Sequence, residues 1–345
     1  MLKKRIKVLV VDDAFLFREK LVQELSKDPT IQVVGTATDA YMARDKIIEL
    51  EPDVMTLDVQ LPKMNGIDFL RRLMPQYPMP VVVVSSISES VFDALNAGAV
   101  DFVAKPDASI GRTVETFISE LIIKIKIAST AKVGYLKKEI KSTESISHKL
   151  DGSSDNKIIA IGASTGGTEA LSSIIKAFPR DMPGTIIVQH MPAVFTKMFA
   201  DRLNNSCVVE VKEAEDGDRI YPGRVLIAPG DYHMALKRTG TIYTVQIFSG
   251  EKVSGHCPSV DVLFDSVADK AGKNAVGVIL TGMGSDGANG LLKMRRKGAR
   301  TIGQDEESCI VYGMPKVAYE IGAVEKQVPL DKVAQIICSI LSMRN

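Results

Sequence analysis

Short apolar runs recur along this 345-residue chain, and a segment with helical spacing of apolar residues separates most runs from the next. Strands that are apolar at every position are buried on both faces, as in a parallel sheet that helices cover on its two sides. In the first half these runs occupy residues 6–11, 32–35, 54–57, 81–84 and 101–104. The first half is therefore predicted to be an α/β domain with a five-stranded parallel sheet.

The alternation is lost in one stretch and then returns. Residues 128–155 are polar and partly basic, with few large apolar side chains, which predicts a linker. We therefore expect one domain at 1–127 and a second at 156–345. The second is predicted to be a doubly wound, mostly parallel α/β domain with an antiparallel β excursion in its middle. Its strands are predicted at residues 158–161, 185–188, 208–211, 224–228, 241–245 and 276–280.

The composition excludes several classes of protein. With 43 basic and 42 acidic residues the net charge is +1, which argues against a protein that coats nucleic acid. The first residues lack the apolar stretch of a secretory leader, and no run is long enough to span a bilayer, so we expect a cytoplasmic protein without membrane insertion. The four cysteines lie far apart, as expected of reduced thiols without a structural zinc site.

Acidic residues follow two strands of the first half. Asp12 and Asp13 come after the first strand, and Asp58 comes after the third. Because neighbouring parallel strands end in one crevice, these carboxylates would repel one another unless a cation lies among them, and Mg²⁺ suits such hard oxygen ligands. Lys105 and Ser85 follow two further strands and would reach the same crevice. The alternative is that the aspartates cap the first helix and Lys105 is a surface lysine.

These residues resemble a response-regulator receiver domain of flavodoxin-like fold. The resemblance covers about residues 1–127, and it implies that Asp58 accepts a phosphoryl group from a chemotaxis histidine kinase. It also implies that Asp12, Asp13, Asp58 and the backbone carbonyl of Gln60 hold Mg²⁺, and that Ser85 and Lys105 sense the phosphoryl group. Ala14 and Gln60 depart from the usual residues. The matching motifs are Val-Val-Asp-Asp at 10–13, Asp58, Leu-Pro-Lys-Met-Asn-Gly at 61–66, Ser-Ser at 85–86 and Lys-Pro at 105–106.

A glycine-rich turn follows the first strand of the second half. Its sequence, Gly-Ala-Ser-Thr-Gly-Gly at 162–167, leads directly into a predicted helix. Such a turn holds the Ser164 hydroxyl at the carboxyl end of the sheet, beside the N–H groups of the helix N-terminus. It has the G-x-S-x-G form of a nucleophilic serine. A turn that only packs the helix onto the sheet, or that binds a phosphate, is the alternative.

A serine nucleophile needs a base, and the chain has four histidines. His148 lies in the linker, His233 is expected at the rim of the β excursion, and His256 lies in a loop before a helix. Ser164 follows the strand predicted at 158–161, and His190 follows the next one, predicted at 185–188. Consecutive parallel strands are often neighbours in the sheet. We therefore predict His190 as the base, with a polar residue that merely ends a strand as the alternative.

The glycine-rich loop after the strand at 276–280 offers the group that would orient the base. Asp286 in this loop would accept a hydrogen bond from Nδ1–H of His190, or it would instead cap the helix that begins near Ala288. The backbone N–H of Met283 is a candidate oxyanion donor. The order Ser164, His190, Asp286 differs from the Ser–Asp–His order of α/β-hydrolases, so that fold is not expected.

The second half is similar to the CheB family of bacterial chemotaxis methylesterases, which usually carry a receiver domain in front. The resemblance implies hydrolysis of glutamate γ-methyl esters on the cytoplasmic domains of methyl-accepting chemoreceptors, with deamidation of glutamines in many members and no cofactor for ester hydrolysis. It makes Ser164, His190 and Asp286 the catalytic triad and ties Thr165 and Met283 to the active site and its oxyanion contacts. Cys257 stands where the family often has Arg. The matching motifs lie at 162–167, 188–192, 228–230, 258–261, 281–287 and 312–315.

The resemblance also implies regulation, in which the unphosphorylated receiver covers the catalytic crevice and phosphorylation of Asp58 relieves this. Two other classes of function are alternatives to a regulated methylesterase. One is a response regulator whose second domain only binds a partner, and a missing triad residue would have favoured it. The other is a DNA-binding output domain, which the charge balance and the lack of a helix-turn-helix pattern disfavour.

Overall fold

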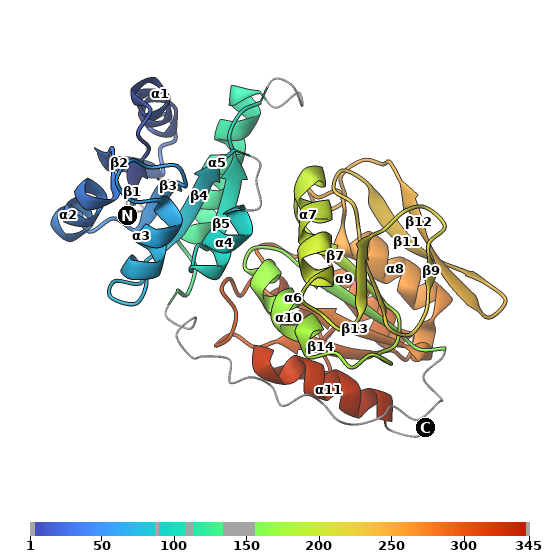
Figure 1. The fold of residues 1–345 in the computed structure, drawn as a ribbon. Helices are drawn as coiled ribbons and strands as arrows, with labels where there is room; N and C mark the ends of the chain where they lie inside the picture. Colours follow the sequence, from blue (N-terminus) through green and yellow to red (C-terminus); the bar gives the residue numbers. More distant parts are fainter. Residues whose placement is uncertain (1–3, 87–89, 108–112, 134–155, 343–345) are drawn as a thin grey trace. The chain divides into compact units, whose positions relative to one another are not determined.

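The computed structural model describes residues 4–86, 90–107, 113–133 and 156–342. The chain divides into two compact units, Met1–Lys138 and Glu139–Asn345, whose folds Figure 1 shows. Most of the predicted linker, residues 134–155, and with it His148, lies outside the described residues. The exact boundaries of the two domains, 1–127 and 156–345, and of the linker at 128–155 stay predictions. The last helix of the first unit, α5, runs to Ala128.

The first unit is an α/β domain with the predicted five-stranded parallel sheet, in the order β2-β1-β3-β4-β5. Among its helices, α1 contacts α5, whereas α3 contacts both α2 and α4. The strand order reverses between β1 and β3, which makes the carboxyl ends of these two strands the place where a ligand binds in such sheets. Its elements are β1 (Ile6–Val11), α1 (Phe15–Leu25), β2 (Ile31–Ala37), α2 (Ala40–Leu50), β3 (Val54–Asp58), α3 (Gly66–Leu73), β4 (Val81–Ser85), α4 (Ser90–Asn96), β5 (Asp101–Ala104) and α5 (Val114–Ala128).

The second unit is built on a seven-stranded parallel sheet in the order β15-β14-β13-β6-β7-β10-β8. Here the order reverses at β6, which lies between β13 and β7. The strands of this sheet are β6 (Ile158–Ala163), β7 (Thr185–Gln189), β8 (Glu210–Glu213), β10 (Arg224–Ile227), β13 (Ala275–Ile279), β14 (Arg300–Gln304) and β15 (Lys326–Val328). The helices of the unit are α6 (Gly167–Lys176), α7 (Ala193–Asn204), α8 (Val260–Lys270), α9 (Ala288–Arg296), α10 (Met314–Glu320) and α11 (Leu330–Ser342), with a 3₁₀ turn at Gly272–Asn274.

The antiparallel excursion is a separate three-stranded sheet of β9 (Arg219–Ile220), β11 (His233–Thr239) and β12 (Ile242–Phe248). The strand predicted at 224–228 belongs to the main sheet instead, where β10 pairs in parallel with β7. All of β10 except Arg224 is buried, which is the pattern of a central parallel strand. The apolar pattern did not predict β14 and β15, which contain polar residues.

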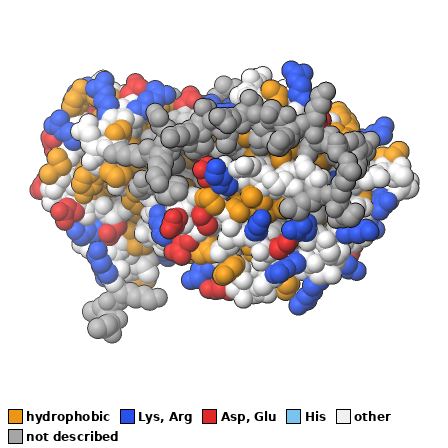
Figure 2. Space-filling model, turned by 90° about the horizontal axis from the view of Figure 1, so that it is seen from below, with side chains coloured by type: hydrophobic (Ala, Val, Ile, Leu, Met, Phe, Trp, Pro, Cys, Tyr) orange, Lys and Arg blue, Asp and Glu red, His pale blue; other side chains and the backbone are white. Residues whose placement is uncertain are grey.

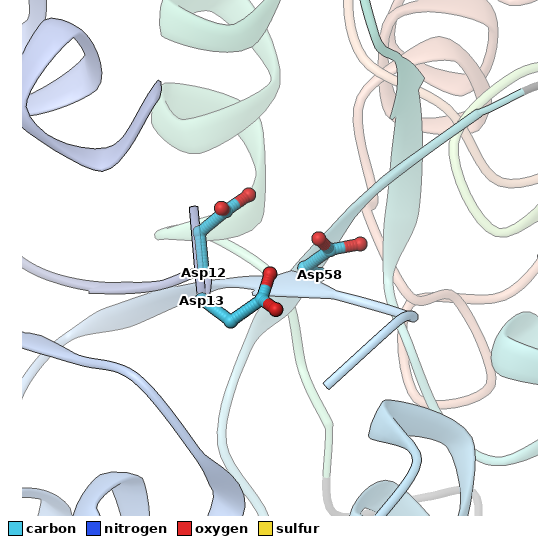
Figure 3. Close-up of side chains that lie close together, drawn as sticks. All are labelled: Asp12, Asp13 and Asp58. Atoms are coloured by element: carbon cyan, nitrogen blue, oxygen red, sulfur yellow. The ribbon is translucent and has the colours of Figure 1, made fainter. Parts of the chain in front are cut away.

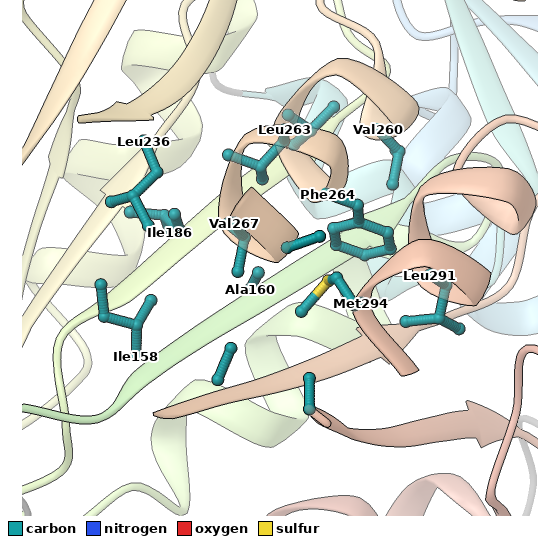
Figure 4. Packing of buried hydrophobic residues seen from close by; sticks show 14 of the residues in the cluster. Ile158, Ala160, Ile186, Leu236, Val260, Leu263, Phe264, Val267, Leu291 and Met294 are labelled. Atoms are coloured by element: carbon teal, nitrogen blue, oxygen red, sulfur yellow. The ribbon is translucent and has the colours of Figure 1, made fainter. Parts of the chain in front are cut away.

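Helix α8 lies between the two sheets and carries much of the core of the second unit. Figure 4 shows Leu263, Phe264 and Val267 of α8 among buried side chains of the main sheet and of β11. The hydroxyl oxygen of Ser266 also accepts a hydrogen bond from the backbone N–H of Leu236 in β11, at 2.8 Å. Since Val260, the first residue of α8, packs against Gly162, the N-terminus of this helix lies at the carboxyl end of β6.

The surface agrees with the balanced charge of the sequence. Basic and acidic side chains are interspersed over the face that Figure 2 shows. In the parts of the chain that the structure describes, no helix is both long enough and apolar enough to cross a membrane.

Candidate active site and candidate metal centre

Ser164 lies where the main sheet of the second unit reverses its strand order. It follows β6 directly, and its backbone N–H donates to the carbonyl of Thr281, the second residue beyond β13, at 3.0 Å. On the other side, Ala163 of β6 pairs with Gln189 of β7, so that Ser164 and His190 are the next residues on two neighbouring strands. The prediction that these two strands lie next to each other is thus confirmed. The Ser164 residue is buried, with 8% of its surface exposed.

The turn around Ser164 needs residues without a Cβ. Gly166 has a φ of 79° and precedes α6, a conformation that L residues rarely adopt. A Cβ on Gly282 would lie 2.6 Å from the Cβ of Ser164, and one on Gly167 would overlap the side-chain oxygen of Gln189. The amide of Gln189 donates to the carbonyl of Ser164 at 2.9 Å and holds the turn against β7.

His190 is bonded to Asp286, although through the other nitrogen than the one predicted. Nε2 of His190 lies 2.8 Å from Oδ2 of Asp286, so the prediction that Nδ1 makes this bond is wrong. Backbone N–H groups hold Asp286 at the N-terminus of α8, and Nε2 is the ring nitrogen of His190 that reaches the carboxylate there. Nδ1 is buried and has no hydrogen-bond partner among the described residues. With a carboxylate accepting from Nε2–H, Nδ1 carries a lone pair and can act as a base.

Asp286 caps a helix, but this helix is α8 rather than α9. Its Oδ1 accepts from the hydroxyl of Ser259 at 2.8 Å and from the N–H of Asp261 at 2.9 Å, and its Oδ2 accepts from the N–H of Val260 at 2.8 Å. Burial by itself would raise the pKa of the Asp286 carboxyl, but the bonds from His190 and from these backbone groups hold it below the ordinary value. The carboxylate is therefore kept ionised beside His190.

Two other histidines lie near this constellation. The ring of His256 stacks on the ring of His190, with centroids 3.6 Å apart and planes inclined by 9°. His233, expected at the rim of the β excursion, is the first residue of β11 and is 2% exposed, and its Nδ1 accepts from the N–H of Ser259 at 3.3 Å. Ser259 is not among the predicted site residues. Its place as the N-cap of α8, a position that favours serine, was the signal that could have found it.

The loop after β13 is fixed to the turn that bears Ser164. The hydroxyl of Thr281 donates to the carbonyl of Thr165 at 3.0 Å and accepts from the N–H of Val311 at 3.0 Å. Thr165 is buried, whereas 43% of Met283 is exposed at the opening of the loop. Thr165, next to Ser164 in sequence, and the loop that contains Met283 thus both lie beside Ser164.

The three predicted carboxylates of the first unit do meet. Single oxygen atoms of Asp12, Asp13 and Asp58 lie within 4.8 Å of one another, and Figure 3 shows their side chains at the ends of two adjacent strands. Nζ of Lys105 bridges Asp58 at 2.6 Å and Asp12 at 3.0 Å. Lys105 is therefore part of the site rather than a surface lysine.

The charges of this cluster do not balance. Burial raises the pKa of the Asp58 carboxyl, and the nearby Asp12 adds to the rise, while Lys105 works against it. Burial would lower the pKa of the Lys105 ammonium, but its bonds to Asp58 and Asp12 raise it overall. One ammonium faces three carboxylates, of which Asp13 is exposed to water. A partly wet group of carboxylate oxygens with excess negative charge fits Mg²⁺.

The remaining predicted residues of the first unit lie around Asp58. The N–H of Gln60 donates to Oδ1 of Asp58 at 3.1 Å. Ser85 ends β4, is 2% exposed, and accepts at its carbonyl from the N–H of Lys105 at 2.8 Å. Asp12 also accepts from the N–H of Ala14 at 2.9 Å, so it stabilises the turn before α1 as well as facing the cluster. The cluster and its surroundings thus come from the ends of β1, β3, β4 and β5.

Comparisons with known proteins agree with this architecture. The family model for the CheB methylesterase matches residues 159–337, and the model for the response regulator receiver domain matches residues 8–112. A protein-glutamate methylesterase/protein-glutamine glutaminase of Syntrophomonas wolfei is 62% identical over 98% of both chains. Another of the same description, from Syntrophotalea carbinolica, is 55% identical over 99% of both.

A solved structure matches the second unit. The crystal structure of the Thermotoga maritima CheB methylesterase catalytic domain is 39% identical, covers 54% of this chain and 98% of its own, and aligns with a TM-score of 0.53. The family match spans more than half of the chain, and the similarity to the full-length relatives runs through both units. The chain therefore belongs to the CheB family of protein-glutamate methylesterases/protein-glutamine glutaminases, enzymes of the chemotaxis response-regulator type with a receiver domain before the methylesterase domain.

Proposed function

We propose that this protein hydrolyses glutamate γ-methyl esters on the cytoplasmic domains of methyl-accepting chemoreceptors, and that phosphorylation of its receiver activates it in chemotaxis adaptation. Deamidation of receptor glutamines belongs to the same proposal, because the described relatives are named for both activities. An ester and an amide of the same side chain differ only in the leaving group, so one nucleophile and one base serve for both.

The bond between His190 and Asp286 supports this function more than any other observation. It fixes the proton of His190 on Nε2, 2.8 Å from the carboxylate, and leaves the buried Nδ1 with a free lone pair. Ser164 follows the neighbouring strand, so Nδ1 is the atom that would take the proton of its hydroxyl. In this proposal Ser164 is the nucleophile, His190 the base and Asp286 the group that orients it.

The reaction runs in two steps. The oxygen of Ser164 attacks the ester carbonyl as Nδ1 takes its proton, and the tetrahedral intermediate expels methanol, which receives that proton from His190. Water then attacks the acyl-enzyme with Nδ1 again as the base, releasing the glutamate carboxylate and the free hydroxyl of Ser164. With a glutamine substrate, ammonia leaves in place of methanol. Backbone N–H groups at Thr165 and Met283 are the proposed donors to the oxyanion.

The receiver supplies the switch in this proposal. The Asp58 carboxylate would accept the phosphoryl group from a chemotaxis histidine kinase, with Lys105 and Ser85 facing the phosphoryl oxygens. Asp12, Asp13, Asp58 and the backbone carbonyl of Gln60 would hold Mg²⁺, which when bound neutralises charge on the phosphoryl group. The new charge at Asp58 would bias a two-state contact between the receiver and the catalytic domain, so that the unphosphorylated receiver covers the crevice and the phosphorylated one releases it.

Replacement of Ser164 tests the catalytic part of the proposal. We expect Ser164→Ala to abolish methanol release from methylated receptor fragments, because no other group in the triad replaces the nucleophile. Ser206→Ala is the matched control: this hydroxyl donates to backbone carbonyls at the end of α7, and its loss should leave the rate unchanged. Full hydrolysis by Ser164→Ala would overturn the proposed reaction.

A further inference from the structure

We propose that Ser259 and His233 are positioning residues for Asp286, and that through Asp286 they set the basicity and orientation of His190. This inference rests on the proposed triad and extends it by two side chains. They come from the N-terminus of α8 and from the first residue of β11. Hydrogen bonds would then link four residues in a chain from the small antiparallel sheet to the base, with the backbone N–H of Ser259 as the link to His233.

Ser259 is the centre of this chain. It is fully buried, and its hydroxyl donates to Oδ1 of Asp286 at 2.8 Å. The same oxygen accepts from the N–H of Val262 at 3.4 Å, as an N-cap side chain does. With a donor bond to Asp286 and an acceptor bond to the helix, the hydroxyl has one orientation left, so its proton stays on the carboxylate side.

His233 holds the backbone of Ser259 in place. Its Nδ1 accepts from the N–H of Ser259 at 3.3 Å, and its Nε2 lies 2.9 Å from the carbonyl of Glu251, an atom that only accepts. These two bonds require the neutral ring with its proton on Nε2. His233 and Asp286 are 2% and 1% exposed, so water does not compete at either end.

The chain fixes both oxygens of Asp286. Oδ1 is held by Ser259 and by the N–H of Asp261, and Oδ2 by Val260 and His190. Among the described residues, two further titratable groups lie beside this pair: the carboxyl of Asp261, which accepts from the N–H of Gly290 at 2.7 Å, and the ring of His256, which stacks on His190. Besides His190 itself, Ser259 supplies the side-chain donor to Asp286 that a mutation can remove without changing the backbone.

Replacement of Ser259 by alanine measures this contribution. We expect kcat for methanol release to fall about 10- to 100-fold, the size of a hydrogen bond to a buried charged group. We also expect the acidic limb of the kcat/KM profile to move to higher pH. With one donor fewer, the negative charge of Asp286 is less dispersed and holds the proton of His190 more strongly. Ser259→Thr keeps the hydroxyl and should recover most of the loss.

Ser266→Ala is the matched control for this measurement. Ser266 lies on the same helix, donates to the carbonyl of Leu263 and accepts from the N–H of Leu236, but it does not contact Asp286. It should lower stability while leaving kcat and the acidic limb unchanged. Equal effects of Ser259→Ala and Ser266→Ala on kcat, with no shift of the limb, would mean that Ser259 is only structural and would overturn the proposal.

A pair of variants at His233 tests the second residue, also if Ser259→Ala does not fold. His233→Asn places an oxygen acceptor near the position of Nδ1 and should retain activity, whereas His233→Leu removes the acceptor and should reproduce the loss and the limb shift of Ser259→Ala. Equal rates for both variants would remove His233 from the proposal. Ser164→Ala distinguishes a failure of the proposed triad from a failure of this inference. If Ser164→Ala is inactive while Ser259→Ala and His233→Leu behave as wild type, the triad stands and only the positioning role of Ser259 and His233 fails.

Discussion

Asp58 and Asp286 occupy corresponding places in two different parallel sheets, yet their surroundings drive their carboxyl groups in opposite directions. Each lies at the carboxyl edge of a sheet beside the point where strand order reverses. Burial raises the pKa of Asp58 despite the ammonium of Lys105. Burial acts on Asp286 in the same sense, but its hydrogen bonds outweigh it and lower the pKa.

The difference lies in the number and kind of donors. Asp58 accepts from Lys105 and from the N–H of Gln60, and it faces two further carboxylates. Asp286 accepts from His190, from the hydroxyl of Ser259 and from two N–H groups of α8. A helix N-terminus holds a carboxylate ionised, whereas an acidic cluster leaves it dependent on added positive charge. The first setting suits a fixed orienting group, and the second suits a site that responds to a ligand.

The largest effect is expected from Asp286→Asn. The amide nitrogen of Asn would face Nε2 of His190 and force the proton to Nδ1, so that the base loses its lone pair. We expect kcat for methanol release to fall by about 10⁴-fold, as in other Ser-His-Asp enzymes with this change. Asp261→Asn is the matched control, because this neighbouring carboxylate accepts from Gly290 and does not contact His190. A loss of equal size in the control would remove the special role of Asp286.

A smaller effect is expected from adding one methyl group beside each nucleophile. Gly282→Ala would push a Cβ against Ser164, and Gly66→Ala would push one against the carbonyl of Asp58. We expect Gly282→Ala to lower the basal rate about 100-fold, since a displacement of about 1 Å has that effect. Gly66→Ala should leave the basal rate intact and remove stimulation by a phosphodonor. If Gly66→Ala were instead to impair basal hydrolysis, the two sites would not be separable as described.

The smallest effect concerns stability and pH. Because the pKa of Asp58 is raised in the folded state, its favourable contribution is fully present below pH 3.8 and is lost as the pH rises through the folded value. Asp58→Asn should therefore stabilise the receiver at pH 7, by on the order of 1 kcal/mol. The pKa of Asp286 is lowered, so its contribution is present above pH 3.8 and is lost as the pH falls through the folded value.

Asp286→Asn should accordingly destabilise the catalytic domain at pH 7. Hydrogen exchange of the full chain, read separately for amides of β3 and β13, measures both changes in free energy. The same sign of change in the two domains would contradict the opposite pKa directions.

The sequence predicted the site residues of both sheets because chemistry and topology agree there. Asp12, Asp58 and Ser164 lie at the carboxyl ends of mostly apolar strands, and such strands are the easiest to recognise. His190 was found because neighbours in sequence are often neighbours in a parallel sheet. Residues that depend on packing between distant segments could not be found in this way.

The N-terminus of α8 is the clearest example. Nothing in the local sequence says that Asp286 binds the start of a helix 26 residues earlier, nor which nitrogen of His190 it meets. The partners of His233 were hidden for the same reason, since β11 belongs to a sheet that packs on α8. Strands β14 and β15 were missed because Thr301, Gln304 and Gln327 interrupt their apolar pattern.

The separation of switch and catalysis is tested most directly by one ratio, the rate of methanol release with a phosphodonor divided by the rate without it. Both rates are measured in the presence of Mg²⁺ on methylated receptor fragments. For the wild-type chain we expect a ratio well above one, and for Asp58→Asn a ratio of one with the wild-type basal rate. Stimulation that survives in Asp58→Asn, or a basal rate that disappears with it, would contradict the separation of switch and catalysis between the two sheets.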